Sequence, residues 1–82
     1  MTTQTKTVIF YSKEKDCPPC EEAKRWFKQN DVEYDYRDVV ANPEYVRELV
    51  QKYRVMSVPV LVVGDEHYVG FDQAEYKRLI LD

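Results

Sequence analysis

The chain has 82 residues, of which 44% are hydrophobic and 33% charged, and its formal net charge is −3. This length and composition predict one globular domain spanning residues 1–82, because a second domain would have no core of its own. The acidic balance argues against a nucleic-acid partner, which needs a basic stripe. No segment approaches the roughly 18 apolar residues of a membrane span, so no membrane contact is expected.

The first part of the chain predicts a strand, a helix and a second strand. Residues 6–11, KTVIFY, are rich in β-branched and aromatic side chains and predict a strand. Helical spacing follows over residues 18–30, and residues 34–39 predict a strand polar enough to lie at a sheet edge. The apolar side of the helix is expected to carry Ala23, Trp26, Phe27 and Asn30. Two strands joined through a helix form a βαβ unit, whose crossover is almost always right-handed.

A second helix is expected to begin at Asn42 and Pro43. Asparagine is a good N-cap, and proline suits the first helical position, where its missing N–H costs nothing. The apolar stripe of this helix is expected to consist of Val46, Leu49, Val50 and Tyr53. The helix would therefore pack on the sheet along that stripe.

The last third of the chain predicts a hairpin and a helix. Residues 59–63, PVLVV, are a continuous apolar run, which is typical of a strand covered on both faces. A Gly-Asp pair then turns the chain, and residues 66–70 return as a fourth strand. Asp72 and Glu75 have the spacing of a capping box and open a helix that runs to about Leu81.

The elements therefore follow the order β-α-β-α-β-β-α. This order predicts an α/β fold with a four-stranded mixed sheet flanked by three helices. The short apolar run of residues 8–11 does not have the form of a signal peptide. We expect a cytoplasmic monomer, in a compartment where thiols are kept reduced.

Both cysteines of the chain lie in the segment DCPPC, residues 16–20. Cys17 falls at the end of the loop after the first strand, and Cys20 falls in the first turn of the first helix. A helix start collects unpaired N–H groups and the positive end of the macrodipole, which lower the pKa of a thiol and favour its thiolate. One cysteine can attack a disulfide and the other can resolve the product. A C-x-x-C motif opening a helix in a βαβ pattern is typical of thiol–disulfide exchange.

A metal site is the alternative use of a cysteine pair. Structural zinc requires four ligands, and this chain offers only the two cysteines and His67, so we expect no metal. A purely structural disulfide is equally unexpected in a reducing compartment.

The segment Ser57-Val58-Pro59 adds a second signal. A proline at the start of an apolar strand cannot donate to the sheet. Val58 is therefore left with backbone groups that are free to pair with an incoming peptide.

Residues 7–81 resemble the glutaredoxin family of the thioredoxin fold, in particular its small glutaredoxin-like redoxins. The resemblance rests on VIFYS before the cysteines, on CPPC followed by alanine, on SVP at 57–59 and on the segment Gly-Phe-Asp after the hairpin. It implies that Cys17 is the exposed nucleophile and Cys20 the resolving thiol. It also implies that Pro59 is a cis-proline beside the disulfide and that Val58 offers main-chain hydrogen bonds to the substrate.

The sequence departs from the family's usual Cys-Pro-Tyr-Cys, because Pro19 replaces the aromatic residue. Pro18 and Pro19 leave the Cys20 amide as the nearest main-chain donor to the Cys17 sulfur, so the thiolate loses a charge-assisted hydrogen bond. The following pair Glu21-Glu22 disfavours the thiolate further, and Lys13 and Lys15 oppose this effect from the loop. We expect a reducing couple, nearer to about −270 mV than to the glutaredoxin range of about −200 to −230 mV.

The region expected to contact substrate or glutathione also departs from the family pattern. Gly70, Phe71 and Asp72 stand where glutaredoxins carry a Gly-Gly turn, and Glu21 stands where they commonly carry a basic residue. Phe71 adds bulk where the tripeptide would lie, and Asp72 is both the expected N-cap and a possible partner of an ammonium group. Glutathione is a possible co-substrate, and thioredoxin reductase is the other possible electron donor.

These observations predict a dithiol oxidoreductase without a bound cofactor. It would reduce disulfide-bearing proteins, or mixed disulfides with glutathione, by ping-pong exchange. Apolar side chains at Tyr11, Val58 and Phe71 are candidates for a docking rim, although packing alone would explain each of them, and Tyr11 is expected in the core rather than at the rim. The alternative is a carrier of a [2Fe–2S] cluster held with the help of glutathione.

Overall fold

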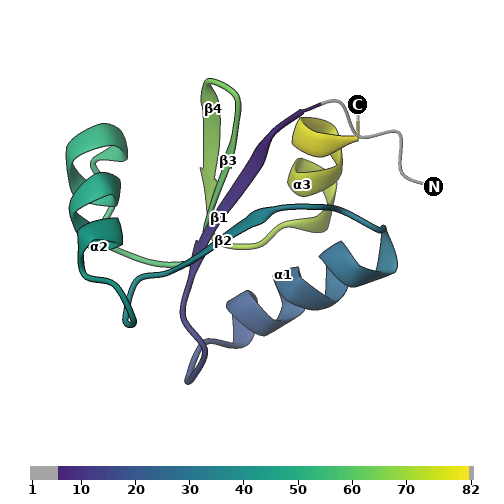
Figure 1. The fold of residues 1–82 in the computed structure, drawn as a ribbon. Helices are drawn as coiled ribbons and strands as arrows, with labels where there is room; N and C mark the ends of the chain where they lie inside the picture. Colours follow the sequence, from purple (N-terminus) through teal and green to yellow (C-terminus); the bar gives the residue numbers. More distant parts are fainter. Residues whose placement is uncertain (1–5, 82) are drawn as a thin grey trace.

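A computed structural model describes residues 6–81, and Figure 1 shows its ribbon. Seven elements match the predicted order, and the second helix continues into an additional π-helical turn, η1. The elements are β1 (Val8–Ser12), α1 (Pro18–Gln29), β2 (Asp35–Asp38), α2 (Glu44–Glu48), η1 (Leu49–Tyr53), β3 (Val60–Val63), β4 (Glu66–Val69) and α3 (Gln73–Ile80). None of the helices within residues 6–81 is long and apolar enough to cross a membrane.

The four strands form one mixed sheet in the order β2-β1-β3-β4. β1 pairs with β2 in parallel, as a βαβ unit requires, and it pairs with β3 in antiparallel orientation. β3 and β4 form the expected hairpin, and Gly64 takes a φ of +60° in its turn, where glycine avoids steric cost. In Figure 1, α1 and α3 lie on one side of the sheet and α2 lies on the other. The predicted fold class is therefore confirmed.

The apolar run of β3 divides its side chains between two cores. Leu61 and Val63 belong to the larger cluster, whereas Val60 and Val62 belong to the smaller one, as the two-residue period of a strand requires. All four side chains are buried. β3 is thus the covered central strand that its sequence predicts.

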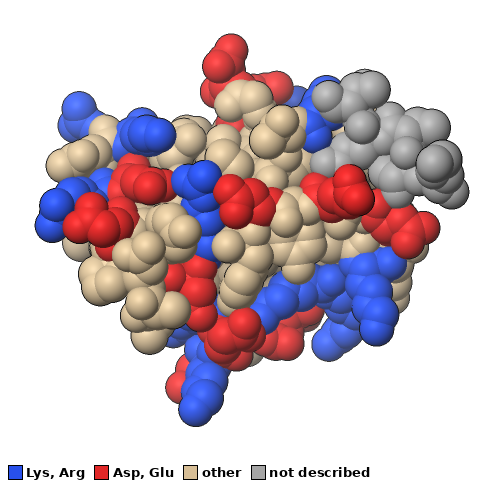
Figure 2. All heavy atoms as spheres, viewed as in Figure 1, with Lys and Arg blue, Asp and Glu red and all other residues tan. Residues whose placement is uncertain are grey.

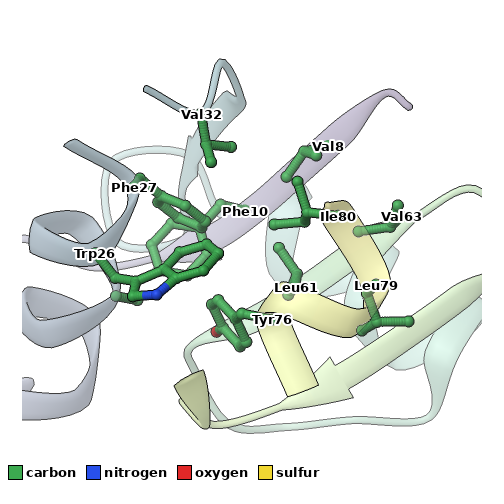
Figure 3. Close-up of a cluster of buried hydrophobic side chains, with 11 residues drawn as sticks. Val8, Phe10, Trp26, Phe27, Val32, Leu61, Val63, Tyr76, Leu79 and Ile80 are labelled. Carbon is green, nitrogen blue, oxygen red and sulfur yellow. The ribbon is translucent and has the colours of Figure 1, made fainter. Parts of the chain in front are cut away.

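Aromatic rings fill the larger core, between the sheet and the helices α1 and α3 (Figure 3). Phe27 of α1 is the hub of these contacts. Its ring centroid lies 4.4 Å from that of Tyr34, 5.0 Å from that of Phe10 and 5.8 Å from that of Tyr76. Edge-to-face and offset ring pairs of this kind add to the free energy of burial. This core holds α1 against the sheet.

Charged side chains attach α2 to the other side of the sheet. Glu48 accepts hydrogen bonds from the Tyr11 hydroxyl and from the Arg37 guanidinium, each at 2.8 Å. Burial, and secondly the bond to Glu48, raise the pKa of Tyr11 to about 12. Tyr11 is a core residue on this evidence, because only 1% of its surface is exposed. The sequence favours packing over a docking rim for Tyr11, so its burial confirms packing and excludes the rim role.

Two expectations about buried helix faces are also corrected. Asn30, expected on the apolar side of the first helix, is exposed and caps that helix, where its Nδ2 donates to the Trp26 carbonyl oxygen at 2.9 Å. In the second helix, only Leu49 of the predicted stripe is buried, whereas Val46 and Val50 are 39% and 37% exposed. The wider π turn changes the angular spacing of side chains after α2, so a stripe drawn at 3.6 residues per turn no longer applies.

Both predicted helix starts are supported by hydrogen bonds. The Asn42 side-chain oxygen accepts from the Glu44 amide at 3.1 Å, just before α2. The Asp72 carboxylate accepts from the amides of Ala74 and Glu75 at 2.9 and 3.2 Å, at the start of α3. Side-chain acceptors of this kind satisfy N–H groups that a helix leaves unpaired.

The ring contacts of Phe27 make its truncation a direct test of the larger core. We expect Phe27→Ala to lower the free energy of unfolding by about 3–5 kcal/mol, because it removes apolar area and leaves a cavity. Urea unfolding followed by circular dichroism measures the change. The neighbouring exposed Lys28→Ala is the control and should stay within about 0.5 kcal/mol of the parent. A loss below about 1 kcal/mol for Phe27→Ala would contradict this packing.

Candidate active site

Cys17 and Cys20 form a disulfide at the start of α1, with their Cα atoms 5.2 Å apart. Cys17 occupies the N-cap position, and Pro18 and Pro19 follow at the first two helical positions. The helix therefore starts at the disulfide, because prolines are favoured in a first helical turn and cannot continue the preceding strand pairing. The predicted placement of the pair is confirmed.

The two sulfurs differ in their access to solvent. Cys20 is 0% exposed and Cys17 is 7% exposed. The expectation of an openly exposed Cys17 is therefore wrong for this disulfide form, because neighbouring residues cover most of its surface. Cys17 nevertheless lines a surface groove, whereas Cys20 does not. A substrate that enters this groove meets Cys17.

The helix start offers few main-chain donors to a thiolate. Pro18 and Pro19 have no N–H, and the Glu21 amide donates to the Cys17 carbonyl oxygen at 3.1 Å. The Cys20 amide is thus the first N–H of the helix. This geometry agrees with the inference from the sequence that the Cys20 amide is the nearest main-chain hydrogen-bond donor to the Cys17 sulfur.

The peptide bond between Val58 and Pro59 is cis, as the resemblance implies. Pro59 is buried, and its carbonyl oxygen accepts from the Gly70 amide at 2.7 Å, which joins it to the end of β4. Among residues 6–81, the N–H and C=O groups of Val58 make no backbone hydrogen bond. Val58 also lines the groove that contains Cys17. A free backbone edge therefore lies along the groove, where an extended chain can pair with it.

The groove has a volume of about 460 Å³ and is mainly apolar. Lys13 and Asp16 are the charged residues in its lining. The rest of the lining comes from the segments after β1 and β2, from the start of α1, from α2 and η1, and from the loop before β3. The lining residues are Lys13, Asp16, Cys17, Pro18, Pro19, Val39, Val46, Leu49, Val55, Met56, Ser57 and Val58.

Several of these residues carry no functional signal in the sequence. Met56 is 85% exposed, although it is a large apolar side chain, and Val46 beside it in the lining is also exposed. Sequence spacing had placed Val46 in the core. Large apolar side chains gathered in the open next to a reactive group indicate a contact surface.

The two loop lysines differ in their positions. Lys13 lines the cysteine groove, whereas Lys15 lines only a neighbouring hollow of about 410 Å³. That hollow also contains Glu14, Asp38 and the exposed Val40. Of the two lysines predicted to tune the thiol, Lys13 is thus the one that faces the groove.

Gly70, Phe71 and Asp72 do not line the cysteine groove. Phe71 is half-buried against Tyr76, with ring centroids 4.9 Å apart, and the Tyr76 hydroxyl donates to the Gly70 carbonyl oxygen at 2.6 Å. Phe71 lines a smaller polar pocket instead, together with residues of α1 such as Arg25. A substrate role for these three residues stays a prediction, because packing and capping already occupy them.

Acidic and basic side chains are interspersed over the face of the molecule that Figure 2 shows. Near the cysteine pair, the charges are organised by Lys24 of α1. Its ammonium nitrogen lies 3.0 Å from Glu14 Oε2 and 3.3 Å from Glu21 Oε2. The hydrogen bond from Lys24 lowers the pKa of Glu14 below its usual value. Burial alone would lower the pKa of Lys24, but its bonds to the two carboxylates raise it above the ordinary value. Lys24 and Glu14 are therefore charged at neutral pH.

Comparison with known proteins gives a consistent result. The glutaredoxin family model matches residues 8–68. The solved structure of a thioredoxin-like protein is 30% identical, with a TM-score of 0.82 over 89% of this chain and 99% of that chain. The NrdH-redoxin from Escherichia coli is 25% identical, with a TM-score of 0.78 over 89% of this chain and 93% of that chain. The glutaredoxin of Archaeoglobus fulgidus shares the fold at 22% identity, with a TM-score of 0.80 over 92% of this chain and 86% of that chain.

No curated protein matches this sequence. The fold and the cysteine pair define a thiol–disulfide oxidoreductase of the thioredoxin-like class. The chain belongs to the glutaredoxin family, whose model covers most of its length.

The hydrogen bonds of Asp72 lead to a prediction about stability. Asp72→Ala should lower the free energy of unfolding by about 1 kcal/mol, because two amides of α3 lose their acceptor. Asp72→Ser is the control and should keep most of the stability, since serine also caps helices. Thermal or urea unfolding of the three proteins makes the comparison. Equal stability of Asp72→Ala and the parent would show that the cap contributes nothing.

Proposed function

We propose that this chain reduces disulfides of proteins, with Cys17 as the nucleophile and Cys20 as the resolving thiol. The observation that carries the proposal is the difference in access within the pair. Cys17 lines the groove, while Cys20 is completely buried behind it. The first sulfur that a substrate can reach is therefore Cys17.

The exchange needs two successive displacements. The Cys17 thiolate attacks one sulfur of the substrate disulfide, forms a mixed disulfide and releases the other sulfur as a thiolate. Cys20, deprotonated as it attacks, then displaces the remaining substrate sulfur from Cys17. The substrate disulfide gains two electrons and, after protonation, becomes two thiols. The chain is left with the Cys17–Cys20 disulfide. A donor dithiol, or two molecules of glutathione, restores the reduced form.

The lining of the groove supports a protein segment as the substrate. Glutathione carries two carboxylates and an ammonium group, whereas Lys13 and Asp16 are the charged residues of the lining. Apolar side chains such as Met56 and Val46 suit apolar residues on either side of a substrate cysteine. The free backbone groups of Val58 suit an extended chain. Protein disulfides therefore fit the groove better than mixed disulfides with glutathione.

A reducing role and a protein electron donor fit the same site. The two prolines remove main-chain donors that would stabilise the Cys17 thiolate, so the reduced form is less favoured and the couple is more reducing. The NrdH-redoxin of Escherichia coli is described as a glutaredoxin-like protein with a thioredoxin-like activity profile. We therefore place thioredoxin reductase ahead of glutathione as the donor.

The alternative of a [2Fe–2S] carrier finds less support in the described residues. Within residues 6–81, no group of three or more His, Cys, Asp or Glu side chains could hold a metal. A cluster would have to take Cys17 out of a disulfide in which it is only 7% exposed. The cluster carrier therefore stays the alternative to the proposed reductase.

A coupled assay tests the proposed function. NADPH consumption is followed with either thioredoxin reductase or glutathione plus glutathione reductase as the electron source, and with a disulfide-containing protein as the substrate. We expect turnover with thioredoxin reductase, and loss of more than about 100-fold in Cys17→Ser, because the nucleophile is gone. Cys20→Ser should instead accumulate a mixed disulfide at Cys17, visible by mass spectrometry.

The matched outcomes separate the alternatives. Turnover only with glutathione would overturn the choice of donor. Turnover retained in Cys17→Ser would overturn the assigned roles. A brown colour in protein purified without oxygen would favour the cluster carrier.

The groove predicts a second effect, on substrate affinity. Met56→Glu should raise the KM for a peptide disulfide flanked by apolar residues by about tenfold, or about 1.4 kcal/mol, because a charge replaces an apolar contact. The KM for the small substrate hydroxyethyl disulfide should change less than about twofold, since it does not reach Met56.

Val69→Glu is the control for added charge, because Val69 is 43% exposed on β4 and does not line the groove. Its KM values should match the parent for both substrates. Equal KM increases for the peptide in both variants would show that net charge, rather than the groove, sets the affinity.

A further inference from the structure

Lys24 connects the segment before the cysteines to the helix after them. It pairs with Glu14, which precedes Cys17 by three residues, and with Glu21, which directly follows Cys20. The hydrogen bond that the Lys24 ammonium donates to the Glu14 carboxylate thus closes a loop of chain that contains the whole disulfide. The Lys24 ammonium also lies 5.3 Å from the centre of the Tyr36 ring on β2.

We propose that Lys24 is a positioning residue that adjusts the reduction potential of the cysteine pair by offsetting part of the negative charge of Glu14 and Glu21. The inference rests on the thiol–disulfide chemistry of the pair and does not depend on which substrate the groove binds. From the sequence alone, acidic and basic residues near the cysteines oppose one another without a clear order. The ion pairs of Lys24 assign the balance between these charges to one side chain.

The burial of the three groups supports this role. The Lys24 side chain is 22% exposed, whereas those of Glu14 and Glu21 are 60% and 54% exposed. An exposed ion pair contributes little to folding, so stability alone does not explain the arrangement. We expect the ion pairs to have a larger effect on the electrostatics of the cysteines, because the Lys24 ammonium faces the two carboxylates that flank the cysteine segment on either side.

The direction of the effect follows from the reduced form. A thiolate at Cys17 is stabilised by the helix start and destabilised by nearby negative charge. Without Lys24, the negative charges of Glu14 and Glu21 repel the Cys17 thiolate with no cation between them to offset part of that charge. The reduced form therefore becomes less favourable. Other charges near the pair, at Lys13, Lys15, Asp16 and Glu22, remain the same. Loss of Lys24 should therefore make the couple more reducing.

The test measures the thiol–disulfide equilibrium in redox buffers of dithiothreitol at constant pH, with the fraction of disulfide read by mass spectrometry after alkylation. Lys24→Met should shift the equilibrium about threefold toward the disulfide, which converts to about 14 mV more negative, since tenfold is about 30 mV for two electrons. Lys24→Arg keeps the charge and should stay close to the parent.

Arg78 offers a matched control on α3. It pairs with Glu75 three residues earlier at 3.1 Å and with Glu66 at 3.7 Å, so it repeats the arrangement of one cation and two carboxylates away from the cysteines. Arg78→Met changes the net charge by the same amount and should leave the equilibrium unchanged.

Two further measurements distinguish charge from structure. Combining Lys24→Met with Glu14→Gln and Glu21→Gln should bring the equilibrium back at least to the parent value, because both carboxylates that act on the thiolate are then removed together with the cation. The shift in Lys24→Met should also shrink in 1 M salt, where the screening length is about 3 Å.

The inference is overturned if Lys24→Met matches the parent, if Arg78→Met shifts the equilibrium equally, or if the triple variant does not recover. A parent protein that forms no reversible disulfide would overturn the chemistry of the pair itself, and this inference with it.

Discussion

The antiparallel pairing of β1 with β3 is the constraint on which the site depends. Tyr11, near the end of β1, pairs with Val60, the first residue of β3. The segment leading to Cys17 and the segment containing the cis bond before Pro59 therefore meet at one edge of the sheet. Because β2 runs parallel to β1, its end reaches the same edge and adds Val39 to the groove. One register thus brings together the proposed nucleophile Cys17, the free backbone groups of Val58 and an apolar wall.

The burial of side chains on both faces of β3 maintains that register. A slip by one residue would exchange the side chains of the two cores, so the pairing that forms the site is also the one that buries Val60 to Val63. The aromatic core then holds α1 in place, and the hydrogen bonds of Glu48 hold α2 on the opposite side. The stability of the fold and the geometry of the site therefore depend on the same strand, while Cys17 lines the groove.

Local patterns were sufficient to predict most of this fold and the centre of the site. The cysteine pair, the proline before β3 and the cap at Asp72 each depend on a few neighbouring residues, and all three lie where the sequence predicts. The groove and the ion pairs of Lys24 depend on contacts between distant segments, which periodicity does not report. Spacing predicted a buried Val46 and gave no signal for Met56, and the exposure of both side chains results from the packing of distant segments.

The central claim is that Cys17 is the reactive sulfur and Cys20 the shielded one. Alkylation of the reduced protein with limiting iodoacetamide near neutral pH, followed by peptide mass spectrometry, tests it most directly. The account predicts that Cys17 is modified at least about ten times faster than Cys20, because reactivity follows thiolate character and access. Equal rates, or faster modification of Cys20, would contradict it.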